Sequence, residues 1–219
     1  MDIWQKYHIL FWVLIGIAIF FLVLIIIYLI LKFGFKRKLS GIGLYLTYYL
    51  LYPLMFIVEI IRFPKRRKAW LIKIGLKEGQ SYLEEGFGMG TSPILASKIV
   101  GKNGVVYALD NHPINIAILY IRSKIRKIKN IEIIFSDAKD TGLEDKSIDT
   151  IFICDAFHEF TDKKNTAIEL YRVLKPGGYL SIWDENVKYT NNAQKIVEAT
   201  KLFKLIEREK SYVKFKKEK

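Results

Sequence analysis

The first third of the chain differs from the rest in its pattern of hydrophobic and polar positions. Residues 9–31 contain no charged side chain and are mostly Ile, Leu, Val and Phe. A helix over this range would be roughly 35 Å long, enough to cross a hydrocarbon core of about 30 Å. Trp4, Tyr7 and Trp12 lie near its start, where aromatic rings favour a membrane boundary. The pattern predicts a transmembrane helix, because the apolar run is too long for a cleaved signal peptide.

A second apolar stretch, at residues 42–61, has two interpretations. Basic clusters flank it on both sides, at residues 36–38 and 65–68. A helix lying in the membrane interface would keep both clusters on one side, whereas a second span would separate them. The sequence leaves both interpretations open.

The excess of positive charge after the first apolar run places the C-terminal side in the cytoplasm. We therefore expect a membrane anchor over residues 1–68, whose basic flank contacts anionic lipid headgroups. Residues 69–219 then form a cytoplasmic catalytic domain.

From residue 69 onward, short β-branched runs alternate with longer helical patterns. Strands separated by crossover helices are typical of an α/β fold with a parallel sheet covered on both faces. The last two expected strands are separated only by Lys210 and Ser211 and resemble a hairpin. Strands are expected at 82–85, 105–110, 131–135, 150–154, 179–184, 203–209 and 212–216. Helices are expected at 92–100, 113–127 and 163–174.

Composition limits the partners and cofactors. The formal net charge of +13 indicates an anionic partner surface. The C-terminal lysines are interleaved with glutamates, which is typical of a solvated surface, so we do not expect nucleic acid as a partner. The single cysteine, Cys154, excludes an internal disulfide and a multi-cysteine zinc site, and no metal site is expected.

The first chemical motif is a glycine-rich turn at residues 82–90. A short strand leads into Gly86, Gly88 and Gly90, and a helical pattern follows. Glycines in this position let the backbone turn sharply and approach a ligand where a Cβ atom would clash. The spacing fits neither a phosphate-binding loop nor a dinucleotide fingerprint.

Three further features follow the next strands. Asp110 ends the second strand, where a carboxylate can accept hydrogen bonds from both ribose hydroxyls of a nucleoside. Asp137 and Ala138 follow the third strand, where a carboxylate can hold an exocyclic amine. Residues 170–179 end a helix and enter a strand through a Pro-Gly-Gly turn.

Together these motifs resemble the class I S-adenosylmethionine (SAM)-dependent methyltransferases, over residues 69 to the C-terminus. The resemblance implies a Rossmann-like, mostly parallel sheet of seven strands with a terminal hairpin, and SAM as the methyl donor. It also implies that Glu84 and the three glycines contact the donor, that Asp110 binds the ribose, and that Asp137 and Ala138 contact the adenine. Asn111 would flank the adenine, although a simple turn before Pro113 explains it as well.

Two positions depart from the family pattern. Glu84 stands where Asp is usual, which keeps the charge, and Phe87 stands where a small residue is usual. Neither change removes a required group.

The segment 154–160, Cys-Asp-Ala-Phe-His-Glu-Phe, lies where this family lines the methyl-acceptor side. Asp155 and His158 are therefore the candidate catalytic residues, with Glu159 beside them, and Asp155 could also contact the donor. The structural alternative is that His158 caps a loop and that the two phenylalanines belong to the core.

The leading functional hypothesis is methyl transfer from SAM to a membrane-associated or amphiphilic small molecule, with S-adenosylhomocysteine as the other product. A lipid headgroup, a quinone precursor or a hydrophobic thiol would fit. The alternatives are a tethered RNA or protein methyltransferase and a non-catalytic SAM-binding membrane protein.

Overall fold

The computed structural model describes residues 11–25 and 64–218. The chain divides into two compact units, Met1–Ile61 and Arg62–Lys219. All the motifs with candidate chemistry belong to the second unit.

The predicted transmembrane helix and membrane location are contradicted in the described residues. Within the expected span, the structure describes a helix over residues 11–25. None of the helices in the described ranges combines the length and the apolar character needed to cross a membrane. Residues 9, 10 and 26–31 of the expected span, and the whole of the second apolar stretch at 42–61, lie outside the described residues.

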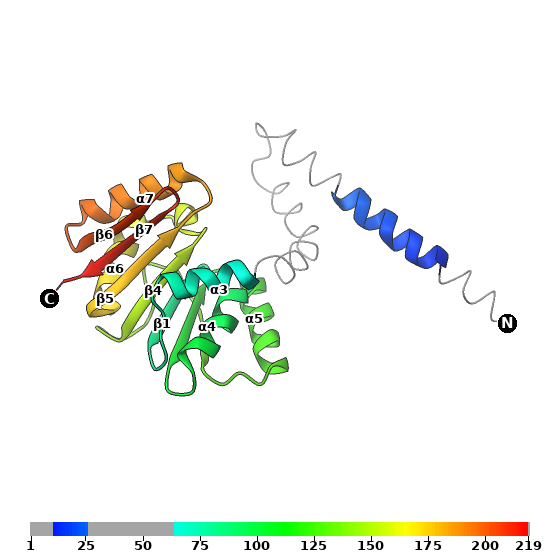
Figure 1. The fold of residues 1–219 in the computed structure, drawn as a ribbon, viewed down its shortest axis with the longest axis horizontal. Coiled ribbons are helices and arrows are strands. Elements are labelled where there is room, and N and C mark those ends of the chain that lie inside the picture. Colours follow the sequence, from blue (N-terminus) through cyan, green and yellow to red (C-terminus); the bar gives the residue numbers. More distant parts are fainter. Residues whose placement is uncertain (1–10, 26–63, 219) are drawn as a thin grey trace. The chain divides into compact units, whose positions relative to one another are not determined.

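The second unit alternates helices and strands around one sheet (Figure 1). The strands are β1 Ser81–Glu85, β2 Val105–Asp110, β3 Ile131–Phe135, β4 Ile148–Cys154, β5 Leu174–Trp183, β6 Phe203–Glu209 and β7 Tyr212–Lys217. The helices are α3 Pro64–Lys73, α4 Thr91–Val100, α5 Pro113–Ile125, the short 3-10 helix η1 Phe157–Glu159, α6 Lys163–Val173 and α7 Val187–Ala199.

The sheet has the order β3-β2-β1-β4-β5-β7-β6. The pairs β2–β3, β1–β2, β1–β4 and β4–β5 are parallel, whereas β7 runs antiparallel to both β5 and β6. The strand order reverses between β1 and β4, and in α/β sheets ligands bind at the carboxyl ends of the strands beside such a reversal. The predicted Rossmann-like sheet with a terminal hairpin is confirmed.

Alternation along each strand gives the sheet two buried faces. On one face, side chains of β1, β4 and β5 pack with α6 and α7, through Leu83, Ile151, Ile182, Leu170 and Val197. On the other face they pack with α3 and α4, through Tyr82, Phe152, Trp183, Leu71 and Ala96. Helices therefore cover both faces, and only the strand ends remain for a ligand site.

Three details differ from the sequence prediction. The Pro-Gly-Gly segment is part of β5, and the register between β4 and β5 shifts there as in a bulge. Helix α7 was not predicted, although Asn186 caps it by accepting a hydrogen bond from the Lys188 backbone N–H at 3.0 Å. Helix α3, which contains the basic run 65–68, was not predicted, and it packs against the sheet through Leu71.

Candidate functional site

The glycine turn between β1 and α4 has the geometry expected of a ligand cradle. Gly86, Gly88 and Gly90 all have positive φ angles, of 69°, 56° and 77°. A Cβ atom on Gly86 would lie 2.4 Å from the Cβ of Ala156, so this glycine lets the β1 and β4 ends approach each other. A Cβ atom on Gly88 would meet nothing within 4 Å, so open space remains beside the turn. The turn therefore fits a bound donor.

Arg122 of α5 forms hydrogen bonds with this turn. Its buried guanidinium donates a hydrogen bond to the carbonyl of Met89, and to Thr91 Oγ1 at 3.3 Å. Charged hydrogen bonds in a buried position are among the stronger ones in proteins. Arg122 thus links the turn to α5, a role that the sequence did not reveal.

Asp110 at the end of β2 is buried and already oriented. One carboxylate oxygen accepts from the Gly88 N–H and from Asn115 Nδ2, both at 3.0 Å, and the other accepts from the His112 N–H at 2.9 Å. Burial raises the pKa of Asp110, although these three hydrogen bonds oppose the shift. The acid is thus joined to the glycine turn, as a ribose-binding carboxylate requires. The neighbouring Asn111 is exposed.

The loop after β3 carries Asp137 and Ala138 and is fastened to α6. Ala138 is buried, and Asp137 Oδ1 accepts from the Lys139 N–H at 3.1 Å. Further along, Glu169 of α6 accepts from the N–H and the hydroxyl of Thr141, at 2.9 and 2.6 Å.

Glu169 also accepts hydrogen bonds from Arg172, which lies in the segment 170–179 that contributes to the family resemblance. The Nε and Nη2 atoms of Arg172 each donate to Glu169 at 2.7 Å, and Nη1 donates to Asp145 at 2.6 Å. Burial alone would raise the pKa of Glu169, but the hydrogen bonds from Arg172 and Thr141 lower it to about 2. This charged network fixes the loop that carries the expected adenine contacts.

Glu84, expected at the donor, lies on the sheet face toward α3 and α4. It is 1% exposed, and its Oε2 accepts from the hydroxyl of Tyr82 at 2.9 Å. The structure therefore places Glu84 two residues before Gly86, in a buried polar pair with Tyr82.

The next residue, Glu85, is a buried acid that the sequence did not single out. Neither of its carboxylate oxygens has a hydrogen-bond partner, and its register neighbours on β2 and β4 are Leu109 and Ile153. Burial, followed by the charges of Glu169 and Asp137, raises the pKa of Glu85 well above its usual range. Burial therefore favours the neutral form of Glu85.

Glu85 makes stability depend on pH with a definite sign. Because its folded pKa is above the unfolded value, the folded state binds the proton more tightly, and stability falls as pH rises from the usual glutamate range toward the raised pKa. We expect Glu85→Leu to stabilise the fold by about 1–3 kcal/mol, since it removes an unsatisfied polar group. Urea unfolding at pH 5 and pH 8 should show a decline in wild type that Glu85→Gln reduces. Glu132→Gln, at an exposed position on β3, is the control. An equal decline in wild type and Glu85→Gln would contradict this account.

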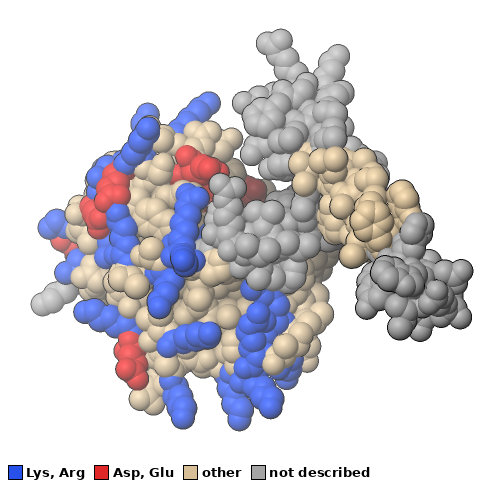
Figure 2. Space-filling view, turned by 45° about the vertical axis from the view of Figure 1, so that its right-hand side comes forward, with Lys and Arg blue, Asp and Glu red and all other residues tan. Residues whose placement is uncertain are grey.

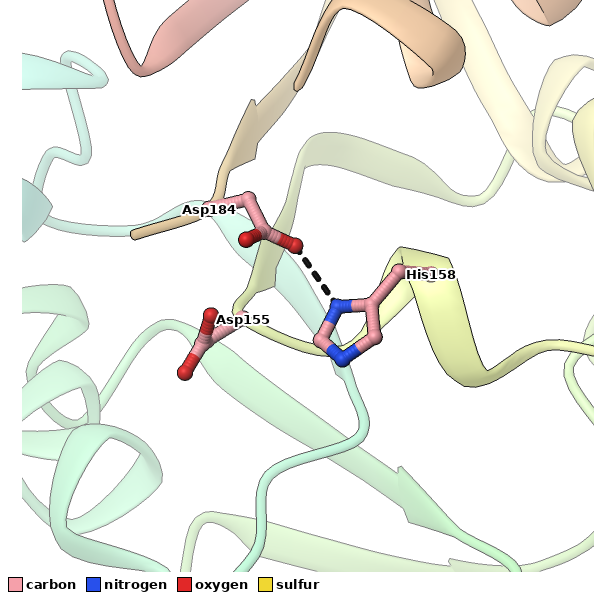
Figure 3. Close-up of side chains that lie close together, drawn as sticks. All are labelled: Asp155, His158 and Asp184. Atoms are coloured by element: carbon pink, nitrogen blue, oxygen red, sulfur yellow. Dashed lines mark hydrogen bonds and ion pairs between the residues drawn. The ribbon is translucent and has the colours of Figure 1, made fainter. Parts of the chain in front are cut away.

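The ends of β4 and β5 bring together the candidate catalytic residues. His158 Nδ1 lies 2.7 Å from Asp184 Oδ2 (Figure 3). The His158 ring stacks on Tyr189 of α7, with centroids 4.3 Å apart. Asp155 lies beside this pair, with a positive φ of 59°. Its Oδ1 accepts from the Glu185 N–H at 3.3 Å. Asp155 and His158 are thus neighbours in space, as the sequence suggested.

Asp184 orients His158. The carboxyl is 2% exposed and also accepts from the Asn186 N–H at 2.9 Å. Burial raises the pKa of Asp184, against the hydrogen bonds from Asn186 and His158. An ionised carboxylate can only accept, so the contact favours a ring proton on Nδ1, and Nε2 on the other side of the ring lies 3.8 Å from Glu159 Oε1.

The same three side chains are the group in the described residues that could hold a metal ion. One ligand atom from each of Asp155, His158 and Asp184 lies within 4.8 Å of the others. The short contact between His158 and Asp184 already uses one atom of each. The arrangement is consistent with a hydrogen-bonded acid–base pair without a metal.

Asp184 and Tyr189 were missed in the sequence. Asp184 was placed at the end of an expected strand and given no role, and Tyr189 lies on the helix that was not predicted. The signal for both was Asn186, a helix-capping residue directly after the fifth strand and before an amphipathic run.

The seven-stranded sheet, the glycine turn, and the ordered acid at the end of β2 define a Rossmann-like SAM-binding methyltransferase. A family model described as a methyltransferase domain matches residues 76–218. The chain therefore belongs to the SAM-dependent methyltransferase-domain family, and SAM is its methyl donor.

Curated relatives and solved structures agree with this assignment. The ubiquinone/menaquinone biosynthesis C-methyltransferase UbiE of Psychromonas ingrahamii is 34% identical over 112 residues, which cover 49% of this chain and 43% of the relative. The same enzyme of Klebsiella pneumoniae gives the same identity and coverage. The chain therefore spans less than half the length of these relatives.

A SAM-dependent methyltransferase from Aquifex aeolicus matches with a TM-score of 0.59 at 25% identity, over 73% of this chain and 91% of that one. A structure from Methanococcus maripaludis, described as a putative SAM-dependent methyltransferase, matches with a TM-score of 0.66 over 76% of this chain and 92% of that one. At 16% identity, it shows the fold alone.

Proposed function

We propose that this protein transfers the methyl group of SAM to a small aromatic or other amphiphilic acceptor, such as a quinone precursor. The observation that carries the proposal is the His158–Asp184 pair at the strand ends, 2.7 Å apart and stacked on Tyr189. The two curated relatives described above are quinone-biosynthesis C-methyltransferases, which supports the choice of acceptor.

Bound SAM would supply an activated methyl group on a sulfonium. The residues of this chain have three tasks. The glycine turn and Asp110 bind and orient the donor, while the fastened loop at Asp137 and Ala138 holds the adenine. At the acceptor, His158 Nε2 removes a proton from a hydroxyl group as the methyl group is transferred. For a phenolic ring, the resulting negative charge spreads onto the ring carbons, so such an acceptor can be methylated at oxygen or at carbon. After methylation at carbon, that carbon loses its own proton to solvent and the ring becomes aromatic again.

Asp184 then stabilises the imidazolium that forms. Its carboxylate keeps the ring proton on Nδ1 and faces the new positive charge from 2.7 Å. Asp155 adds negative charge next to the pair. A sulfonium and an imidazolium are both favoured by such an acidic setting.

The test is a panel of acceptors with the purified full-length chain and labelled SAM. We expect transfer to a hydroquinone or a phenol, with the position of the new methyl group assigned by mass spectrometry and NMR. Transfer confined to thiols, or to RNA or protein, would contradict the proposed acceptor class. Binding of SAM without transfer to any acceptor would instead support the non-catalytic alternative.

A further inference from the structure

Helix α3 begins with a cluster of positive charge, Lys65, Arg66, Arg67 and Lys68, and its first turn contains no acid. Positive side chains at this end of a helix oppose the helix dipole, so they do not stabilise α3 locally. Lys73, at the other end of α3, forms ion pairs with Glu207 and Glu209. The positive charge at the C-terminal end of α3 is therefore paired with acids, whereas several positive charges are concentrated at its N-terminal end.

Both arginines of this cluster contact the carboxyl ends of the strands that carry the candidate site. The guanidinium carbon of Arg66 lies 4.6 Å from the centre of the Trp183 ring, and Arg67 Nη1 donates to Cys154 Sγ. Trp183 and Cys154 are the last residues of β5 and β4. The residues that follow them directly in the chain are Asp184 and Asp155.

The backbone keeps these two strand ends together. The Asp155 N–H donates to the carbonyl of Trp183 at 2.7 Å. The side chains of Trp183 and Cys154 belong to the sheet face toward α3 and α4. Residues that alternate along a strand point to opposite faces, so Asp184 turns toward α7 and His158. An acceptor lying across this edge of the sheet can meet the acid–base pair on one side and Arg66 on the other.

Arg66 is exposed, and no carboxylate within the described residues forms an ion pair with it. An indole ring holds a guanidinium in place without neutralising its charge. A planar guanidinium with free donors matches a carboxylate or a phosphate, to which it can donate two parallel hydrogen bonds. Many Lys and Arg side chains also cover the visible face of the catalytic unit, with few acids between them (Figure 2).

We propose that Arg66 forms an anion subsite of the acceptor pocket, and that the acceptor is a small aromatic molecule that carries a carboxylate or a phosphate group. This inference rests on the proposed function, because the reacting hydroxyl of the acceptor is placed beside His158.

The experiment uses the full-length chain loaded with S-adenosylhomocysteine and measures binding by calorimetric titration. The probes are 4-hydroxybenzoate, 4-hydroxyphenyl phosphate and the neutral analogue 4-hydroxybenzamide. We expect an acid to bind more tightly than the amide, and the two acids distinguish a carboxylate from a phosphate ligand. In Arg66→Gln, affinity for the preferred acid should fall roughly ten- to a hundredfold, the loss of one charged hydrogen-bonding pair, whereas affinity for the amide should not change.

Lys68→Gln is the matched control, because it removes the same charge from an exposed position of α3. Arg66→Lys keeps the charge but not the planar fork, and it should retain part of the preference for the acid. Unchanged binding of S-adenosylhomocysteine shows that each variant is folded.

Equal binding of the acid and the amide by the wild type would overturn the proposed subsite. An equal loss of affinity for the acid in Arg66→Gln and Lys68→Gln would also overturn it. So would binding of a short RNA that depends on Arg66 when neither acid binds. Methyl transfer is measured separately with the same probes. Binding that depends on Arg66, without methyl transfer, would refute the proposed function and leave the anion subsite intact. Equal methyl transfer to the acid and to the amide would refute the anion subsite and leave the proposed function intact.

Discussion

Replacing His158 by Asn is expected to lower kcat by roughly 100- to 10,000-fold, the range that positioned general bases contribute. Asn retains polarity near Nδ1 but has no group that can take a proton at neutral pH. S-adenosylhomocysteine should bind as in wild type, because the proposed donor contacts are those of the glycine turn and Asp110, which are joined by a hydrogen bond from the Gly88 N–H. Single-turnover kinetics with a phenolic acceptor measure the effect. A variant that loses donor binding in proportion to activity would instead indicate that His158 only supports the fold.

The His158–Asp184 pair also predicts the effect of replacing Asp184 and the way in which activity depends on pH. Asp184→Asn should also reduce kcat, because a neutral amide can leave His158 in the wrong tautomer and no longer stabilises the imidazolium. Since burial raises the pKa of Asp184, the wild type should lose activity on acidification at a higher pH than an ordinary carboxyl would give. In Asp184→Asn this part of the acid limb should disappear. An unchanged acid limb would assign it to another group.

The fold could be predicted from the sequence because its strong signals are local. Short β-branched runs predicted each strand within a few residues, since buried parallel strands must be almost uniformly apolar. The glycine turn and Asp110 were identified in the same way, because each needs a particular residue type at a strand end. The exceptions were α3, whose basic start was read as part of a membrane flank, and α7, whose polar composition hid its amphipathic pattern.

The rest depends on contacts between distant segments. Asp184 meets His158 only because β4 and β5 are neighbours, and no spacing along the chain encodes a contact across 26 residues. Arg122 reaches the turn at Met89 from a separate helix, and Arg66 reaches Trp183 from the start of α3. Each of these contacts depends on how separate elements pack, which the sequence pattern does not specify.

Replacing Asp110 by Ala is expected to weaken the binding of S-adenosylhomocysteine at least about a hundredfold. In the proposed donor site the carboxylate accepts hydrogen bonds from the two ribose hydroxyls, and charged hydrogen bonds contribute about 1.5–3 kcal/mol each. The same substitution removes the acceptor for the Gly88 N–H and Asn115 Nδ2, so the glycine turn loses its link to the end of β2. Calorimetric titration measures the loss.

The pH dependence of donor binding separates the charge of Asp110 from its shape. Because burial raises the pKa of Asp110, wild-type affinity should fall on acidification before exposed carboxyls titrate, since the protonated acid accepts fewer hydrogen bonds. Asp110→Asn keeps the size of the side chain and should bind more weakly, without this pH dependence. Asp140→Asn, at an exposed position in the loop after β3, should behave as wild type. If Asp110→Asn bound the donor as tightly as wild type across the pH range, the ribose contact would have to come from another residue. The ribose-binding role assigned to Asp110 by resemblance to the family would then be wrong.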